Sequence, residues 1–322
     1  MLTHLTMILL AVVAQDAPAK PAATTATEAL AVQVALDRAG FSPGVIDGQL
    51  GTNTRRAREA YRGRHSKDVE PIAEPLIAYS ITPDDVNLPY TGNIPTDLMK
   101  QSELPALSYT SPLEAVAERF HTTPQLLKRL NPNATFAAGE QVTVPNVEPF
   151  IVPAPRIDAP AKPQRPERGT AGRNAAPKPV DLPAKPNVTV TVSRGASALT
   201  VMDDQNQIIF YAPVTTGSEN DPLPIGEWIV TGVQYSPEFR YNPELFWDAD
   251  PSHAKATLKA GPNNPVGVVW VDLSKEHYGI HGTPEPANIG KTASHGCVRL
   301  TNWDALRLAG LVKPGTRVVF EE

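Results

Sequence analysis

The stretch YGIHGTPEPANIGKTASHGCVRL, residues 278–300, contains Cys297, the only cysteine of the chain, and two of its histidines. His281 ends an apolar run that is typical of a strand and lies sixteen positions before Cys297, whereas His295 lies two positions before it. A strand followed by a loop of this length can fold back and bring an imidazole beside the sulfur. Because a free thiol is only slightly ionised at neutral pH, a nucleophilic cysteine needs such a base. The stretch therefore predicts a reactive cysteine paired with a histidine.

Two glycines and an arginine support this interpretation. Gly282 and Gly296 leave the backbone free to turn sharply and to point N–H groups at one spot, as an oxyanion hole requires. Arg299 follows Cys297 by two positions, and its planar guanidinium suits a carboxylate.

Other interpretations stay open at this point. A free cysteine is often a small buried hydrophobic side chain, and either histidine can be a core residue whose hydrogen bonds are satisfied. His281, His295 and Cys297 are also residue types that bind zinc, but no compact fourth ligand is evident beside them. We therefore predict no metal and no cofactor.

The composition is that of a globular protein with added linker. Of 322 residues, 41% are hydrophobic and 20% are charged, but 34 are proline, which is about twice the usual share. The length suggests about two domains, and small modules would raise that number. The net charge of -5 offers no broad basic face, so we expect no nucleic-acid partner. No apolar run is long enough to predict a spanning helix.

The first residues have the pattern of an export signal. A short apolar run from Leu5 to Ala14 carries small residues at Val12 and Ala14, the two positions that a signal peptidase reads. We expect residues 1–14 to be a signal peptide, with a buried terminal helix as the alternative. An exported chain in the periplasm or cell wall uses thiols in pairs or avoids them, so a lone thiol there forms a bridge to another chain or is reactive.

Residues 25–66 are predicted to form a small helical domain. Thr25 has capping-box spacing before a first helix that Gly40 ends, and Thr52 is expected to cap a second helix. The stretch ALDRAGFSPGVIDGQLGTNTRRAREAY resembles the small helical peptidoglycan-binding domain. It departs from that family at Tyr61-Arg62, where Phe-Gln is usual, and an unrelated helical hairpin is the alternative.

Residues 107–147 are predicted to form a second module. Apolar residues recur at helical spacing from Leu113, Thr123 is placed to cap a second helix, and an alternating EQVTVP strand follows. The order strand, helix, helix, strand resembles LysM, a glycan-binding module. This degenerate copy lacks the usual Gly-Asp-Thr before its first helix, so its alternative role is that of a spacer.

Residues 148–186 are predicted to be a proline-rich linker. Proline recurs every few residues with Ala, Lys and Arg between, and large apolar side chains are rare. Such a segment buries too little surface to offset its ordering, and proline stiffens it. We expect a semi-rigid arm.

The last part of the chain, residues 187–322, is typical of a mainly β domain. Runs of β-branched residues broken by Gly and Pro predict six strands, at 188–194, 198–203, 207–217, 226–236, 265–273 and 315–322. One helix is expected near Trp303 to Val312, with Asn302 as its cap. Residues 235–264 are expected to form a loop or lid over the site, with aromatic side chains that could touch a substrate.

The motifs of this part resemble one family closely. IHGTPEPANIGKTASHGCVRL, followed by TNWDALRLAGLVKPGTRVVF, is similar to the signature of the L,D-transpeptidase catalytic domain, called YkuD-like. PLPIGEW and GPNNPVGVVWVDL resemble the family's upstream segments. The resemblance spans residues 188–320, and the whole chain is then expected to be a multidomain α+β protein with a mainly β catalytic domain and a small helical N-terminal module.

The resemblance implies a reaction and a set of residues. Cys297 is the expected nucleophile of an acyl transfer from a peptidoglycan stem tetrapeptide, and His281 is its base, held by a backbone carbonyl near Gly282. The remaining expected site residues support catalysis or bind substrate: Ser294, His295, Gly296, Arg299, Gly282 and Tyr278. A second stem as acceptor gives a 3-3 cross-link, whereas water gives trimming.

The implied partners are peptidoglycan stem peptides and glycan strands, with carbapenem β-lactams as inhibitors. A wall-linked lipoprotein is a further implied partner, since enzymes of the same fold attach or release such proteins. An L,D-carboxypeptidase and a non-catalytic wall-binding scaffold are the other functions that this sequence leaves open.

Overall fold

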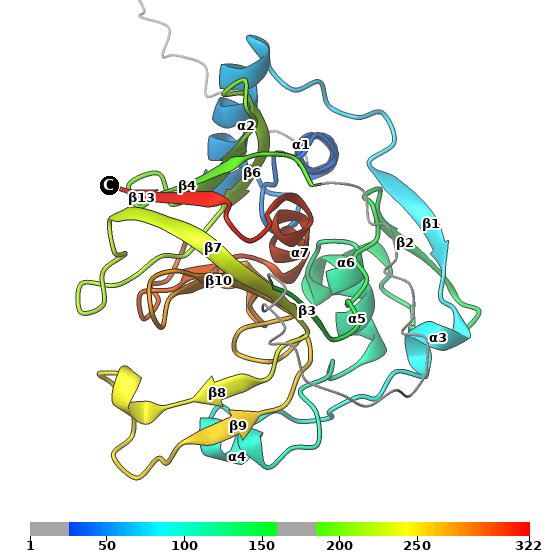
Figure 1. Cartoon of the computed structure of the whole chain (residues 1–322). Coiled ribbons are helices and arrows are strands. Elements are labelled where there is room, and N and C mark those ends of the chain that lie inside the picture. Colours follow the sequence, from blue (N-terminus) through cyan, green and yellow to red (C-terminus); the bar gives the residue numbers. More distant parts are fainter. Residues whose placement is uncertain (1–25, 160–184) are drawn as a thin grey trace, which may run out of the picture.

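The computed structural model describes residues 26–159 and 185–322 (Figure 1). The expected signal peptide and most of the expected linker lie outside these residues. Within them, no helix has the length and apolar character that crossing a membrane requires.

The first described range contains α1 Ala26–Arg38, α2 Thr52–His65, β1 Leu76–Ser80, α3 Pro83–Val86, α4 Leu98–Ser102, α5 Pro112–Arg119, α6 Pro124–Leu130, β2 Gln141–Pro145 and β3 Arg156–Asp158. The second contains β4 Thr189–Ser193, β5 Ala198–Met202, β6 Ile208–Pro213, β7 Gly226–Tyr235, β8 Phe239–Tyr241, η1 Pro243–Leu245, β9 Ala256–Leu258, β10 Val269–Leu273, β11 Gly279–His281, η2 Pro286–Asn288, β12 Val298–Arg299, α7 Asn302–Leu311 and β13 Arg317–Glu321.

A nine-stranded sheet is the centre of the C-terminal domain. Its order is β12-β11-β10-β7-β13-β4-β5-β6, and β3 pairs with β7 outside this path. Two pairs are parallel, β11 with β12 and β13 with β4. Burial alternates along the strands, as in β4, where Val190 and Val192 are buried between less buried neighbours. The predicted strands are present, and the mainly β C-terminal domain is confirmed.

The helix α7 packs on the sheet and completes its core (Figure 1). Trp303 and Leu308 on this helix are almost fully buried. The expected cap was wrong by one residue, because the Thr301 side chain accepts from the Asp304 N–H and is the N-cap. Asn302 is instead the first helical residue, and its amide makes tertiary contacts.

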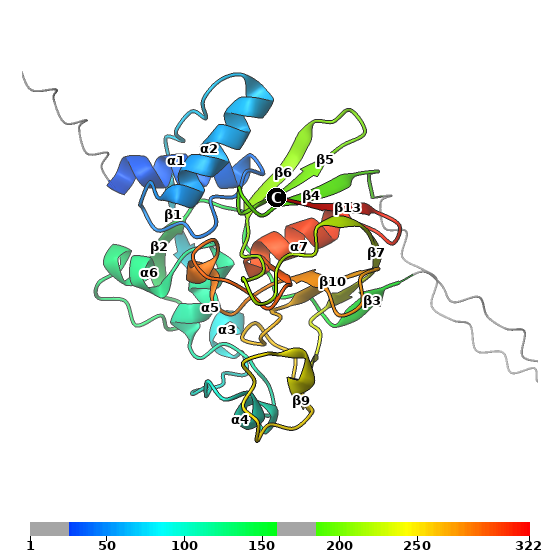
Figure 2. The ribbon, with the colours of Figure 1, turned by 90° about the vertical axis from the view of Figure 1, so that its left-hand side faces the viewer.

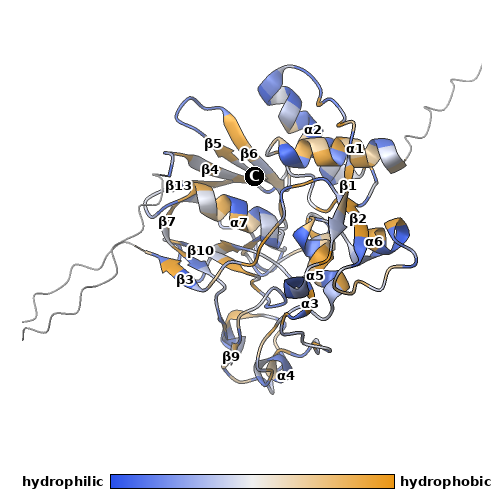
Figure 3. Cartoon of the chain, turned by 90° about the vertical axis from the view of Figure 1, so that its right-hand side faces the viewer, coloured by the Kyte–Doolittle hydropathy of each residue, from blue (hydrophilic) through white to orange (hydrophobic). Residues whose placement is uncertain are grey.

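The helices α1 and α2 lie beside β6 at the far edge of the sheet (Figure 2). The chain after α1 turns at Gly40, at φ +80°, and Phe41 then bridges to Tyr211 of β6. Figure 3 shows α1 as largely apolar and α2 as largely polar. Eight residues of α1 are buried, whereas only Thr54 and Ala57 are buried in α2. Thr52 is the first residue of α2 rather than its cap, which is Gly51 without a side-chain bond.

The middle segment is built around a two-stranded ladder, β1 with β2, and the helices α5 and α6. Thr123 caps α6 as predicted, since its side chain accepts from the Leu126 N–H. The strand that pairs with β2 is Leu76–Ser80, which lies outside the expected range 107–147. Two short helices, α3 and α4, separate that strand from α5.

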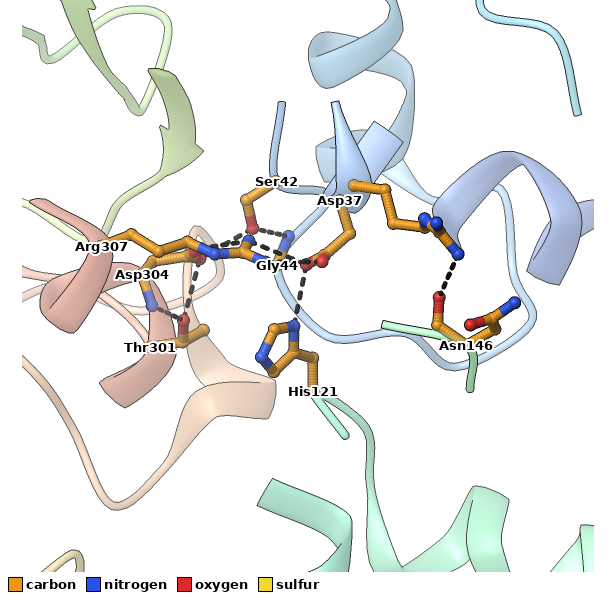
Figure 4. Close-up of polar contacts among 9 residues, drawn as sticks. Asp37, Ser42, Gly44, His121, Asn146, Thr301, Asp304 and Arg307 are labelled. Atoms are coloured by element: carbon orange, nitrogen blue, oxygen red, sulfur yellow. Dashed lines mark hydrogen bonds and ion pairs between the residues drawn. The ribbon is translucent and has the colours of Figure 1, made fainter. Parts of the chain in front are cut away.

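A buried polar network fastens the first described range to α7 (Figure 4). The Asp37 carboxylate accepts from the Arg307 guanidinium at 2.8 and 3.1 Å and lies 3.0 Å from Nδ1 of His121. Asp304 accepts from Ser42 at 2.7 Å. Burial opposes ionisation of Asp37, but the charges of His121 and Arg307 hold its pKa well below the usual range. The N-terminal part is therefore docked on α7 of the C-terminal domain through buried charged contacts.

The start of the expected linker also belongs to this fold. Phe150 is buried in the core of the sheet, and β3 adds an antiparallel strand to β7. Where the described chain resumes, the Lys185 ammonium lies 3.4 Å from the Asp158 carboxylate. Residues 148–158 are therefore not part of a free arm, because Phe150 packs in the core of the sheet and the β3 backbone pairs with β7. The proline content of this segment does not reveal these contacts.

Candidate active site

One large cavity, of about 1260 Å³, opens beside the β11 end of the sheet. Five of the eight expected site residues line it: Tyr278, His281, His295, Cys297 and Arg299. Gly282, Ser294 and Gly296 do not line the cavity but contact residues that do. The sequence stretch 278–300 is thus brought together around a single space.

The parallel pairing of β11 with β12 places the histidine and cysteine. His281 is in register with Arg299, and Ile280 with Val298. Cys297 immediately precedes β12, and in this register it lies next to Gly279 of β11. Side chains two positions apart on a strand share a face, so His281, Arg299 and Cys297 all face the cavity.

His281 is held in one orientation. Its Nδ1 donates to the Gly282 carbonyl at 2.7 Å, and its ring stacks on Trp270 with centroids 5.3 Å apart. Burial and the nearby Arg299 charge lower its pKa from 6.5 to about 3, so the ring is neutral at physiological pH. With Nδ1 carrying the proton, Nε2 is left as the basic nitrogen.

Cys297 is partly exposed to the cavity. Its Sγ makes a long contact of 3.8 Å with the His277 carbonyl. Desolvation raises the pKa of the thiol, although the Gly279 N–H and the Arg299 charge oppose this rise. The cavity is therefore lined by a neutral thiol and a neutral imidazole, and a thiol in this state needs a base in order to act as a nucleophile.

The turn before Cys297 is fixed by three residues. The Ser294 hydroxyl donates to the Cys297 carbonyl at 2.5 Å. Gly296 has φ +90°, and an added Cβ would lie 2.6 Å from the Tyr278 ring. Only glycine combines this backbone conformation with the close approach of Tyr278.

Arg299 is the cation that faces the cavity next to His281. Its backbone is fixed by mutual hydrogen bonds with Thr215 at 2.9 and 3.1 Å. Within residues 26–159 and 185–322, its guanidinium has no hydrogen bond or ion pair to another side chain. Burial lowers the pKa of Arg299 without neutralising it. The group is free to receive an anion.

His295 faces the segment 235–264, which the sequence predicted as a lid. Its Nε2 lies 2.7 Å from the Asp248 carboxylate, and its ring meets the edge of Phe246 at 5.1 Å. Trp247 is 61% exposed beside the same ring. The segment carries the β8–β9 hairpin and lines the cavity, so we call residues 235–264 the flap.

A satellite core supports the flap from the middle segment. Leu107 packs with Tyr241 and Leu258 of the β8–β9 hairpin, and α4 lies beside β9. The Tyr241 hydroxyl also lies 3.0 Å from Nδ1 of His253. Residues outside the catalytic domain thus help to form the cavity wall.

Sequence reasoning missed Trp270 and Asp248. Trp270 was placed in a strand, but nothing showed that its ring would lie flat on His281. Asp248 is 47 positions from His295, and no local pattern links the two. Among the described residues, no three His, Cys, Asp or Glu side chains gather as a metal site would require.

Comparison with known proteins identifies the C-terminal domain. Residues 187–320 match the profile of the L,D-transpeptidase catalytic domain, YkuD. Bacillus subtilis YkuD, a protein assigned to the L,D-transpeptidases, is 28% identical over 209 residues, which are 64% of this chain and 91% of that protein. Escherichia coli YbiS, assigned likewise, is 29% identical over 150 residues, 45% of this chain and 48% of that protein.

Among solved structures, L,D-transpeptidase 3 from Mycobacterium tuberculosis aligns with a TM-score of 0.35 and 20% identity. The alignment covers 42% of this chain and 62% of that one, which is less than two thirds of its length. The profile match and the two relatives show that residues 187–320 are an L,D-transpeptidase catalytic domain.

Proposed function

We propose that this chain is an exported cysteine L,D-transpeptidase that acts on peptidoglycan stem tetrapeptides through a thioester at Cys297. The observation that carries this proposal is that Cys297 and His281 line one cavity, with the Nδ1 of His281 bound to a backbone carbonyl, so that Nε2 is the basic nitrogen. A neutral imidazole in this state is the base that a neutral thiol needs.

In the first half-reaction, Sγ of Cys297 attacks the carbonyl carbon of the third stem residue, and Nε2 of His281 takes the thiol proton. N–H groups of the turn at Gly296 and Cys297 stabilise the negative oxygen of the tetrahedral intermediate. The C–N bond to D-alanine then breaks, and the imidazolium returns its proton to the leaving amine. The product is a thioester between Cys297 and the donor stem.

In the second half-reaction, an acceptor amine attacks the thioester carbonyl and gives its proton to His281. The C–S bond breaks, and the thiolate regains a proton from the imidazolium. A side-chain amine of a second stem gives a 3-3 cross-link, and water gives a shortened stem instead.

The other site residues position the substrate or the nucleophile. The free guanidinium of Arg299 suits a stem-peptide carboxylate, and Tyr278 lies on the cavity wall beside Gly296. Ser294 holds the carbonyl of Cys297, and His295 joins the turn to the flap. Each therefore acts on the orientation of the reacting groups.

The N-terminal part is proposed to bind the wall and to be exported with the catalytic domain. Residues 25–66 would act as the peptidoglycan-binding module and residues 107–147 as the LysM-like one, after removal of signal peptide 1–14. Binding to an insoluble polymer raises the local substrate concentration without changing the site. Periplasm or cell wall is the proposed location.

The nucleophile is tested by the intact mass of the protein after exposure to imipenem, a carbapenem. We expect one covalent adduct on the wild-type protein and none on Cys297→Ala, because the thiol is the only cysteine in the chain. A folded wild-type protein that gains no mass, or an adduct that persists in Cys297→Ala, contradicts the assignment.

The reaction is tested with purified muropeptides. A tetrapeptide donor should yield cross-linked dimers by mass, and loss of more than a thousandfold is expected in Cys297→Ala. Shortened monomers alone would indicate an L,D-carboxypeptidase. Lysine adducts would indicate attachment of a wall-linked lipoprotein. An unreactive thiol together with the absence of any product would favour a wall-binding scaffold.

A further inference from the structure

The amide of Asn302 lies behind the catalytic strand and is fully buried. Its Oδ1 accepts from the Val268 N–H at 3.1 Å, and its Nδ2 donates to the Pro262 carbonyl at 3.1 Å and to Glu118 at 2.8 Å. Reversing the amide would set its NH₂ group against the Val268 N–H. The surroundings therefore select one orientation of Asn302.

The same amide oxygen lies against Gly282, whose carbonyl holds His281. A Cβ added to Gly282 would lie 2.1 Å from Oδ1 of Asn302, and one added to Gly267 would lie 2.0 Å from it. The Gly282 carbonyl is 2.7 Å from Nδ1 of His281. A rotation of the Asn302 amide would thus displace the group that sets the tautomer and ring plane of His281.

The acceptor for Asn302 comes from outside the catalytic domain. Glu118 lies on α5, is 7% exposed, and accepts from the Tyr109 hydroxyl at 2.5 Å as well as from Asn302. Within the described ranges no Lys, Arg or His forms an ion pair with it. A buried carboxylate without a cation costs stability, so packing alone does not account for Glu118.

We propose that Glu118 is a positioning residue for His281, acting through the Asn302 amide and the Gly282 carbonyl. The proposal rests on the proposed function, in which His281 is the base. Ionised Glu118 accepts two hydrogen bonds and holds Asn302 in its observed orientation. Protonated Glu118 becomes a donor itself and gives up one of them. The α5 segment is then part of the catalytic unit as well as an accessory module.

The ionisation of Glu118 falls in the neutral range. Burial raises its pKa from 4.5 to about 7, opposed by the hydrogen bonds from Tyr109 and Asn302 and supported by the charge of Glu114. His281 has a pKa of about 3, and the pKa of Cys297 is raised, so neither of these groups titrates near pH 7.

Asp304 is the matched control for this link. It lies on α7, as Asn302 does, and is fully buried, and burial raises its pKa to about 6. Its hydrogen bonds go to Ser42 and Thr301 rather than toward Gly282. Asp304→Asn therefore removes a second buried carboxylate of near-neutral pKa without touching the proposed link.

The test measures the rate of imipenem acylation of the full chain between pH 5 and 9. For the wild type we expect the rate to rise through about pH 7, the value to which burial raises the pKa of Glu118. Glu118→Gln cannot titrate and mimics the protonated side chain, so its rate should stay near the low-pH rate of the wild type and lose this rise. Glu118→Ala removes the acceptor and should be about tenfold slower or more at pH 8.

Asp304→Asn should keep the wild-type profile. Tyr109→Phe leaves the Asn302 bond but removes a donor that lowers the pKa of Glu118, so the rise should move to higher pH. This variant also decides the matter if Glu118→Ala does not fold. A rise near pH 7 that persists in Glu118→Gln, or that disappears in Asp304→Asn, overturns the proposal.

A second measurement separates this proposal from the proposed function. In the full chain labelled with ¹⁵N-histidine, the Nδ1–H signal of His281 should shift between pH 6 and 8 in the wild type and stay constant in Glu118→Gln. No turnover is needed for this measurement. Absence of imipenem acylation in the wild type would refute the function, whereas an unchanging His281 signal would refute the positioning role.

Discussion

Two buried polar links join the N-terminal half to α7, and they differ in charge. The first is the Asp37 network, in which the carboxylate meets Arg307 and His121 (Figure 4). The second is the Glu118–Asn302 bond, in which a carboxylate meets only neutral donors. A buried carboxylate paired with cations makes a strong contact. A buried carboxylate without a cation lowers the stability of the fold, and its ionisation changes with pH. The contrast separates a contact that holds the N-terminal part on α7 from one that, in the role proposed for Glu118, orients His281.

The largest effect should come from breaking the compensated link. Asp37→Asn leaves Arg307 and His121 without their carboxylate and should lower the free energy of unfolding by about 3 kcal/mol, measured by urea denaturation. Acylation by imipenem per folded molecule should not change. If Asp37→Asn keeps the wild-type free energy of unfolding but loses acylation, the distinction between the two links is wrong.

The second effect is the opposite pH dependence of two variants. The pKa of Glu118 is raised to about 7, so the folded state binds its proton more tightly, and ionisation costs stability as pH rises from about 4.5 to 7. Glu118→Gln should therefore gain roughly 3 kcal/mol relative to the wild type over that window. Urea denaturation at a series of pH values measures this difference.

The contribution of Asp37 to stability has the opposite pH dependence. Its pKa is lowered, so its contribution is complete above the unfolded value of 3.8 and is lost as pH falls further. The deficit of Asp37→Asn should accordingly shrink below about pH 4 in the same denaturation series. A deficit that grows on acidification would show that the Asp37 carboxylate is not held ionised by its partners.

The smallest effect tests one hydrogen bond at the edge of the charged network. Ser42→Ala removes a donor to Asp304 at 2.7 Å and should cost about 1 kcal/mol, seen as a small shift in the urea midpoint. Acylation and its pH profile should remain those of the wild type. A loss of several kcal/mol would mean that Ser42 supports the whole network rather than a single bond.

The gathering of residues 278–300 around one cavity could be predicted because its information is local. His281, Cys297 and the glycines between them lie on one short segment, and resemblance to a family supplied their roles. The strands could be predicted for a similar reason, since β-branched residues mark them directly. The chemical roles of the site residues remain predictions that the acylation and muropeptide assays test.

The links between modules could not be predicted, because each joins residues far apart in the chain. Glu118 lies beside Val116 and Ala117 on a helix whose apolar face was clear, but its burial depends on α7. Asn302 suited a helix cap, yet Thr301 takes that place and frees the amide for Glu118. Local patterns describe a helix face but not the partner that will cover it.

The strand β3 has a consequence for how the chain is connected. This strand precedes residues 160–184 in the chain and pairs with β7 of the C-terminal sheet. Lys185, which follows those residues, forms an ion pair with Asp158 of β3. The two described ranges are therefore joined by noncovalent contacts as well as by the covalent connection between them. A protease cut within it would leave two fragments joined through β3, Phe150 and the Asp37 network. Such a nicked protein should copurify as a noncovalent pair that retains the cavity at Cys297, and the two halves should reconstitute it when produced as separate chains.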